Sequence, residues 1–244
     1  YILGVYSLYE RLIQEFPDVL FESCASGGAR FDPGMLYYAP QAWTSDDTDA
    51  VERIKIQYGK SYVYPLSSMG SHVSASPNHQ IFRSTSLETR GNVAYFGTFG
   101  YELDITKLTE KELEQMKEQI TFMKQHRDLI QKGEFYRLES PFKGNQAAWE
   151  VVAKDGSEGL MAYFRVRQPI QGKLERIYFS GLEETKAYEV RECFGEKTDF
   201  GVHYGDELMY VGFSVSDCSS GLVGVARTGQ GDGYSRLFHF RKVN

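Results

Sequence analysis

Two short stretches near the start of the chain combine residue types that carry out chemistry. The stretch Glu22 to Asp32 holds a cysteine, two adjacent glycines and an arginine, and the stretch Gln41 to Ala50 holds a tryptophan and three aspartates. A tryptophan offers an apolar face to a sugar ring, aspartates and backbone groups bind hydroxyls, and a carboxyl group protonates a glycosidic oxygen. The two stretches together therefore suit a carbohydrate site.

The elements that must position these residues alternate between strands and helices. Apolar residues recur at helical period from Leu3 to Phe16, and the short run Val19 to Glu22 is typical of a buried parallel strand that ends in the glycine loop. The segment Gln41 to Ser45 is expected to form a second strand that runs into the acidic loop Asp46 to Asp49, and a helix follows. In parallel α/β folds ligands bind at the carboxyl ends of strands, so both loops lie where a site is expected.

The rest of the chain divides into two patterns. Two more short apolar segments occupy residues 62–69 and 93–99, and Thr109 with Glu112 forms a capping-box pattern that predicts a helix reaching about Gln131. Repeated strand and helix units indicate a parallel sheet. Beyond Gly133, short aromatic and β-branched runs separated by turn residues are typical of an antiparallel β-sandwich. We therefore predict a boundary near residues 133–138 and two units, 1–135 and 136–244.

Each candidate residue also has a plainer explanation. Asp46, Asp47 and Asp49 fit a solvated helix N-terminus, where capping and the helix dipole favour aspartate, and spacing alone does not separate Asp46 from Asp47. A lone cysteine such as Cys24 is usually a small buried hydrophobe. Trp43 suits core packing as well as a sugar contact.

The residues themselves resemble those of a known family. The run Glu-Ser-Cys-Ala-Ser-Gly-Gly-Ala-Arg-Phe-Asp at 22–32 and the run Gln-Ala-Trp-Thr-Ser-Asp-Asp-Thr-Asp-Ala at 41–50 are similar to a pair of signatures in the α-galactosidases of glycoside hydrolase family 36. Residues 70–74 and 87–93 are similar to later barrel segments of that family. The resemblance implies the C-terminal half of a (β/α)8 barrel followed by an antiparallel β-sandwich domain.

The resemblance also implies an activity and the residues that serve it. Family members are retaining glycosidases that remove terminal α-1,6-linked galactose from oligosaccharides of the raffinose and melibiose type, and the full-length protein is expected to be a homo-oligomer. Asp46 matches the general acid/base, and Cys24 matches a galactose-contacting position. Gly27 and Trp43 are expected to complete the substrate-binding site, and no metal or other cofactor is predicted.

The second carboxylate of a retaining mechanism is not found in this sequence. In the family it lies in a Trp-Asp-x-Asn motif on an earlier strand, and neither Trp43 nor Trp149 is followed by Asp. The chain begins with Tyr1 and not with Met, so we expect it to start partway through the barrel. We therefore expect the chain alone to expose apolar surface and to lack α-galactosidase activity.

Composition and charge argue against several other classes. A net charge of −6 without a block of basic residues gives no footprint for nucleic acid or for an anionic membrane surface, and no apolar run approaches the roughly 20 residues of a membrane span. Cys24, Cys193 and Cys218 are an odd and widely spaced set, which indicates neither a disulfide framework nor a paired metal motif. A reducing, cytoplasmic compartment is the expected location.

Two rival functions stay open at this point. Asp47-Thr48-Asp49 matches the metal-binding Asp-x-Asp of a nucleotide-sugar glycosyltransferase, which would depend on manganese. A carbohydrate-binding module built on the C-terminal sandwich would instead hold a glycan with aromatic residues such as Trp149 and Tyr163.

Overall fold

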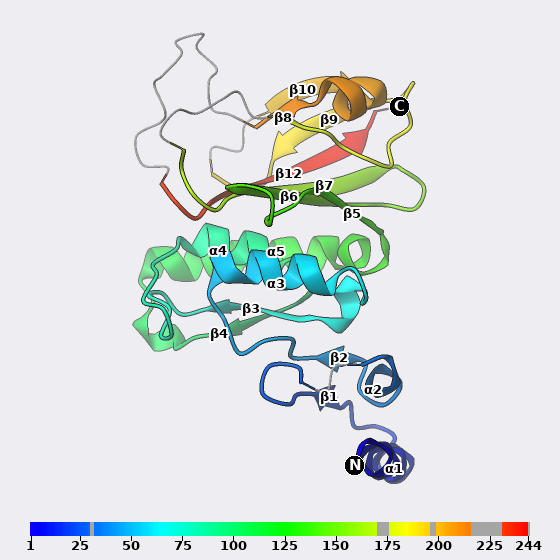
Figure 1. Ribbon diagram of the computed structural model, residues 1–244. Helices are drawn as coiled ribbons and strands as arrows, with labels where there is room; N and C mark the ends of the chain where they lie inside the picture. Colours follow the sequence, from blue (N-terminus) through cyan, green and yellow to red (C-terminus); the bar gives the residue numbers. More distant parts are fainter. Residues whose placement is uncertain (30–31, 170–175, 196–198, 216–230, 244) are drawn as a thin grey trace.

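The first half of the chain repeats a strand followed by a helix, as Figure 1 shows. The structure is a computed structural model that describes residues 1–29, 32–169, 176–195, 199–215 and 231–243. The strands are β1 (Glu22–Ser23), β2 (Gln41–Ala42), β3 (Gly70–Ser74) and β4 (Thr98–Glu102), and the helices that follow them are α2 (Pro33–Tyr38), α3 (Ala50–Lys60), α4 (Leu87–Ala94) and α5 (Glu110–Lys132). Helix α1 (Ile2–Glu15) precedes them, and short 3₁₀ turns occupy Leu66–Ser68 and Ile105–Lys107.

These strands are parallel and adjacent in chain order. β1 pairs with β2, Ala42 at the end of β2 bridges to Met69 just before β3, and β3 pairs with β4. Consecutive parallel strands, each followed by a helix, form half of a (β/α)8 barrel. The barrel half implied by the sequence is therefore confirmed.

Strands β3 and β4 begin later than the apolar segments at 62–69 and 93–99 suggested. Residues 66–68 form a 3₁₀ turn, and Val93 and Ala94 are buried residues at the end of α4. The buried part of the first segment is therefore a turn, preceded by the exposed Tyr62 and Val63, and the second segment starts with a buried helix end.

Side-chain caps fix where the helices begin. The carboxylate of Asp49 accepts the backbone N–H groups of Val51 and Glu52 at the start of α3, and Thr109 with Glu112 forms the predicted capping box of α5. Such caps satisfy helix N–H groups that have no partner inside the helix, and each contributes about 1 kcal/mol.

After Gly133 the chain forms an antiparallel sheet of six strands in the order β10-β9-β12-β7-β6-β5. Its strands are β5 (Glu134–Glu139), β6 (Gln146–Val152), β7 (Glu158–Arg165), β9 (Ala187–Glu192), β10 (Asp199–Tyr204) and β12 (Tyr234–Lys242). A smaller sheet pairs β8 (Arg176–Ile177) with β11 (Phe213–Ser214), and a π-helix spans Glu207–Val211. The change from helix to strand falls between Lys132 and Glu134.

The six-stranded sheet is buried on both faces. On one face Trp149 and Val151 share a core with Phe122 of α5, and on the other face Met161 packs in a core with Phe213. In Figure 1 helices α3, α4 and α5 lie between this sheet and strands β3 and β4. The C-terminal unit therefore covers the outer helices of the barrel half.

This burial decides against one rival function. Trp149 is 1% exposed and Tyr163 is 0% exposed. A glycan on the surface cannot reach either ring, so the carbohydrate-binding hypothesis built on these two residues is wrong.

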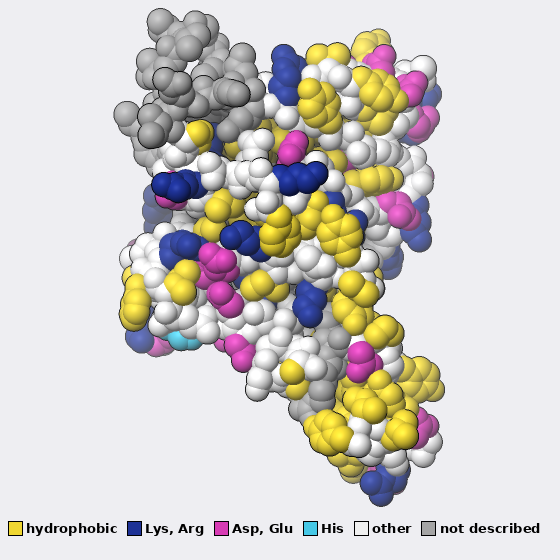
Figure 2. All heavy atoms as spheres, viewed as in Figure 1, with side chains coloured by type: hydrophobic (Ala, Val, Ile, Leu, Met, Phe, Trp, Pro, Cys, Tyr) yellow, Lys and Arg dark blue, Asp and Glu magenta, His cyan; other side chains and the backbone are white. Residues whose placement is uncertain are grey.

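The amino-terminal end presents an apolar surface. No residue of α1 is buried, and Leu3 and Leu20 are 78% and 89% exposed. Hydrophobic side chains gather over this end of the molecule in Figure 2. Contiguous apolar surface of this kind normally has a covering partner. Within the described residues, no helix is both long enough and apolar enough to span a membrane.

Candidate active site

The glycine loop after β1 and the acidic loop after β2 lie against each other. β1 and β2 are parallel neighbours, and the backbone N–H of Trp43 donates to the carbonyl oxygen of Ser23 at 3.0 Å. Parallel strands place their carboxyl ends at one edge of the sheet. The structure therefore brings Cys24, Gly27, Trp43 and Asp46 to the same edge, as the sequence predicted for loops at consecutive strand ends.

Gly27 is the closest point of contact between the two loops. Its φ is +71°, and a Cβ atom placed on it would lie 2.7 Å from the backbone nitrogen of Asp46 and 3.1 Å from the Cα of Ser45. Gly28, with φ of +89°, approaches the carbonyl oxygen of Thr44 in the same way, at 3.0 Å. Because only glycine fits such a contact at such a φ, this loop sets the position of Asp46.

Trp43 is half-buried and held by polar neighbours. Its ring centroid lies 4.6 Å from that of His72, and the Arg53 guanidinium lies 5.3 Å from the indole centroid. A Cβ atom at Gly70 would lie 2.9 Å from the indole Cε3. Trp43 thus combines packing with partial exposure, and both roles that the sequence left open are compatible with its place.

The aspartates of the acidic loop have different environments. Asp46 is exposed, and within the described part of the chain no residue hydrogen-bonds to its carboxylate. Asp47 accepts the backbone N–H of Asp49 at 3.0 Å, which ties its carboxylate to the turn before α3. The structure therefore separates Asp46 from Asp47, which spacing alone did not.

Asp49 is a structural residue. It is 1% exposed, accepts two backbone N–H groups at 3.0 Å each, and forms an ion pair with Arg83. A carboxylate held in this way is not available to a metal ion. Over the described ranges, no group of three or more His, Cys, Asp and Glu residues is placed to hold a metal ion.

Sequence reasoning did not single out Arg53. Its guanidinium donates to the carbonyl oxygen of Gly70 at 2.6 Å and to that of Ser45 at 3.5 Å, and so it links the acidic loop to β3. Burial lowers the pKa of Arg53 to about 10, and the charges of Asp47 and Glu102 act in the opposite direction. Arg53 therefore keeps its positive charge at neutral pH, directly behind the acidic loop.

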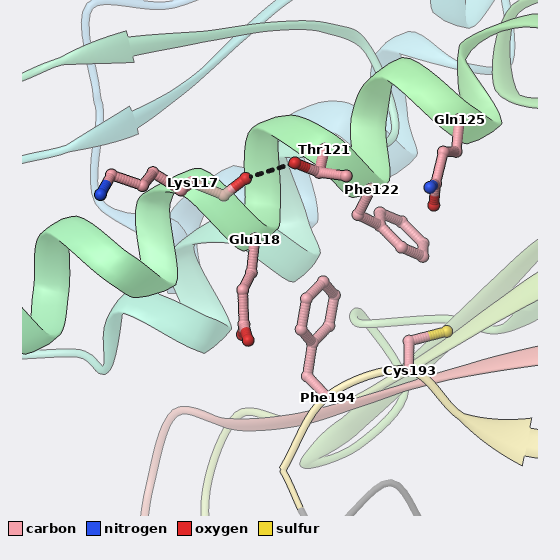
Figure 3. A pocket seen from close by; sticks show the side chains of 7 residues that line it. All are labelled: Lys117, Glu118, Thr121, Phe122, Gln125, Cys193 and Phe194. Carbon is pink, nitrogen blue, oxygen red and sulfur yellow. Dashed lines mark hydrogen bonds between the residues drawn. The ribbon is translucent and has the colours of Figure 1, made fainter.

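A separate cavity of about 340 Å³ lies between α5 and the end of β9 (Figure 3). Phe122 and Phe194 lie on two sides of it with ring centroids 5.1 Å apart, and Cys193 and Glu118 also line it. Burial raises the pKa of the Cys193 thiol, which disfavours the reactive thiolate. No residue of the glycine loop or the acidic loop lines this cavity, so it is not part of the candidate site.

Comparison with known families agrees with this architecture. A family model described as Melibiase matches residues 1–133, and one described as Glycosyl hydrolase family 36 C-terminal domain matches residues 146–240. The chain belongs to glycoside hydrolase family 36. The resemblance drawn from the two loop sequences is confirmed.

Relatives within family 36 match the chain along its length. Alpha-galactosidase AgaA of Geobacillus stearothermophilus is 55% identical over 223 residues, which is 91% of this chain and 30% of the relative. A solved structure of an AgaA variant in complex with raffinose has a TM-score of 0.89 and 51% identity, and covers 100% of this chain and 31% of that chain. Another AgaA variant, in complex with stachyose, has a TM-score of 0.88 and 52% identity, and covers 99% of this chain and 31% of that chain. The chain thus spans less than a third of the length of these relatives.

Proposed function

We propose that this chain forms the carboxyl-terminal part of the catalytic region of a retaining α-galactosidase. The enzyme removes terminal α-1,6-linked galactose from oligosaccharides of the raffinose and melibiose type. Family membership and the raffinose and stachyose complexes of AgaA support this substrate class. Asp46 is the general acid/base, and the carboxylate nucleophile comes from barrel strands outside these 244 residues.

Asp46 acts in both steps of the reaction. In the first step the nucleophile attacks the anomeric carbon while the carboxyl group of Asp46 donates its proton to the glycosidic oxygen, so that the leaving sugar departs as an alcohol. In the second step the ionised carboxylate of Asp46 takes a proton from the water that attacks the galactosyl enzyme. A group that changes protonation state twice in each turnover is hindered by fixed charged partners.

The environment of the Asp46 carboxylate is the observation that carries this proposal. Asp46 is exposed at the shared edge of the two loops, whereas Asp47 accepts a backbone N–H and Asp49 is a buried helix cap. Of the three aspartates, Asp46 alone combines exposure with a carboxylate that no described residue binds. It is therefore best placed to meet a substrate.

Cys24, Gly27 and Trp43 form the sugar-binding part of the proposed site. Cys24 is an exposed free thiol directly after β1, and part of the Trp43 indole stays accessible. Gly27 serves the site through its close contact with the backbone of Asp46. The thiol and the indole contact the galactose, and Gly27 sets the distance between them and the acid.

The test compares Asp46→Ala with Asp47→Ala in the complete polypeptide that contains this chain. A general acid contributes about 10² to 10⁴-fold to the rate, and the contribution is largest for leaving groups that need protonation. Asp46→Ala should therefore lower kcat/KM for raffinose far more than for p-nitrophenyl α-galactoside, and Asp47→Ala should affect both substrates equally. The opposite pattern would show that the acid is Asp47.

A metal-dependent glycosyltransferase is the weaker alternative. In the sequence Asp47-Thr48-Asp49, the second carboxylate caps α3 and pairs with Arg83. For the hydrolase, activity should be the same with added manganese and with a chelator. Activity that requires manganese would favour the transferase.

We also propose that the complete enzyme is a cytoplasmic homo-oligomer. Cys24 and Cys193 are free thiols, as in a reducing compartment, while Cys218 lies outside the described residues. Oligomerisation rests on the family resemblance, and light scattering of the complete polypeptide tests it. A monomeric mass would contradict it.

A further inference from the structure

Two aromatic rings, one directly after β2 and one in the middle of β3, are each seated over a glycine of the next strand. Trp43 follows β2, and a Cβ atom at Gly70, the first residue of β3, would lie 2.9 Å from its Cε3. His72 lies in β3 in register with Gly100 of β4, and a Cβ atom at Gly100 would lie 2.8 Å from the imidazole Cδ2. Any other residue at either glycine would displace the ring beside it.

The two rings and a carboxylate form a row across three strands. The ring centroids of Trp43 and His72 are 4.6 Å apart with the planes inclined by 37°, and Nδ1 of His72 lies 3.8 Å from a carboxylate oxygen of Glu102 in β4. We name Trp43, His72 and Glu102 the stacked row. Its geometry places the imidazole between the indole and a negative charge.

The stacked row lies on the face of the strands that is turned away from the helices. The neighbours of His72 in β3 face the helices, because Ser71 donates to Gln57 of α3 and Val73 packs with Leu87 of α4. Successive residues in a strand point to opposite faces, so His72 points to the barrel interior. Barrel interiors are usually filled with branched apolar residues, and a row of this composition is therefore not ordinary core.

Charges from several elements face His72. Burial lowers the pKa of the imidazole, Glu102 of β4 and Glu22 of β1 raise it, and Arg53 of α3 lowers it. The two carboxylates and the guanidinium thus shift the pKa of the His72 imidazole, which contacts Trp43, in opposite directions.

We propose that His72 is a positioning residue that holds the Trp43 indole in its sugar-binding orientation, with Glu102 orienting the imidazole. This inference rests on the proposed function, because Trp43 matters to turnover only if it contacts the sugar. His72 itself does not touch the substrate. Its contribution passes through the indole, so its loss weakens binding more than it slows the chemical steps.

The first test is kinetic and uses the complete polypeptide. An aromatic pair contributes enough to change binding by up to about tenfold. His72→Ala should therefore raise KM for raffinose about tenfold with a smaller change in kcat, and His72→Phe, which keeps a ring, should restore KM. His79→Phe is the matched control, because His79 is exposed in the loop after β3 and should change neither constant. Equal KM values for His72→Ala, His72→Phe and the unmodified protein would overturn the proposal.

The second test does not need activity. The fluorescence difference between the unmodified protein and Trp43→Phe isolates the Trp43 signal, and a protonated imidazole stacked on an indole quenches its emission. The Trp43 signal should therefore titrate with pH, and the titration should vanish in His72→Phe and persist in His79→Phe. A titration that persists in His72→Phe would overturn the stacked row. If the unmodified protein had no α-galactosidase activity, the proposed function would fail while this measurement would still decide the contact.

Discussion

Replacement of Gly27 by alanine tests how the glycine loop positions the acid. Two costs arise from the structure. The φ of +71° places a Cβ in the left-handed region, which costs about 1–2 kcal/mol for a residue other than glycine. The Cβ would also lie 2.7 Å from the backbone nitrogen of Asp46, so the loops must separate by about 0.7 Å to reach an ordinary contact of 3.4 Å.

This displacement should appear as lost activity. A misplacement of about 1 Å in a catalytic group lowers the rate by about 10²-fold, so Gly27→Ala should reduce kcat for raffinose by roughly that factor. Gly201→Ala is the matched control, because Gly201 has a φ of +82° and no atom within 4 Å of its added Cβ. It should lose similar stability and keep its activity.

The assay combines kcat on raffinose with thermal unfolding of both variants in the complete polypeptide. The two glycines share a positive φ, but only Gly27 contacts the backbone of Ser45 and Asp46, so the difference in kcat measures the effect of moving the acidic loop. Full activity in Gly27→Ala, at whatever stability, would refute the view that this contact places Asp46.

Three further predictions concern other parts of the chain. Glu150 is buried, its Oε1 accepts the backbone N–H of Ser180, and burial raises its pKa well above the usual range. The contribution of Glu150 to folding stability is therefore fully present below about pH 4.3 and declines by about 1.4 kcal/mol per pH unit as pH rises toward the folded-state pKa. Glu150→Gln should remove this decline, and parallel pH profiles of melting temperature for both proteins would contradict it. Asp49→Ala should lower the free energy of unfolding by about 1–2 kcal/mol, because α3 loses its cap, whereas Asp46→Ala should leave the melting temperature unchanged. An equal fall in melting temperature in both variants would argue against separate roles for the two aspartates. The 244-residue chain alone should bind a hydrophobic dye and show no hydrolysis of p-nitrophenyl α-galactoside, and hydrolysis that is lost on Asp46→Ala would place a nucleophile within it.

The fold was predictable from the sequence where local patterns decide structure. The capping box of Thr109 and Glu112 and the two loops at strand ends follow from residue types and spacing, and the structure has them as predicted. The apolar segment at 62–69 was misleading, because its buried residues belong to a turn and its first two residues, Tyr62 and Val63, are exposed. Trp149 and Tyr163 were misjudged as glycan-binding candidates because both faces of their sheet are covered by distant segments, the Trp149 face by α5 and the Tyr163 face by β8 and β11.

The candidate site was predictable in its location and not in its internal contacts. Residue types placed Cys24 and Asp46 at neighbouring loops, but only the side-chain partners distinguish Asp46 from Asp47. The stacked row depends on the register that sets His72 opposite Gly100, and one sequence does not reveal a strand register between two parallel strands.

The most direct test of the central claim is the configuration of the product when azide restores activity to Asp46→Ala. Without its acid/base, the enzyme still forms the galactosyl intermediate from a substrate with a good leaving group, and azide attacks that intermediate without needing a base. If Asp46 is the acid/base, the product is α-galactosyl azide, because two displacements retain the configuration of the substrate. Formation of β-galactosyl azide would mean that a single displacement occurred and that Asp46 is the nucleophile, which would contradict the account.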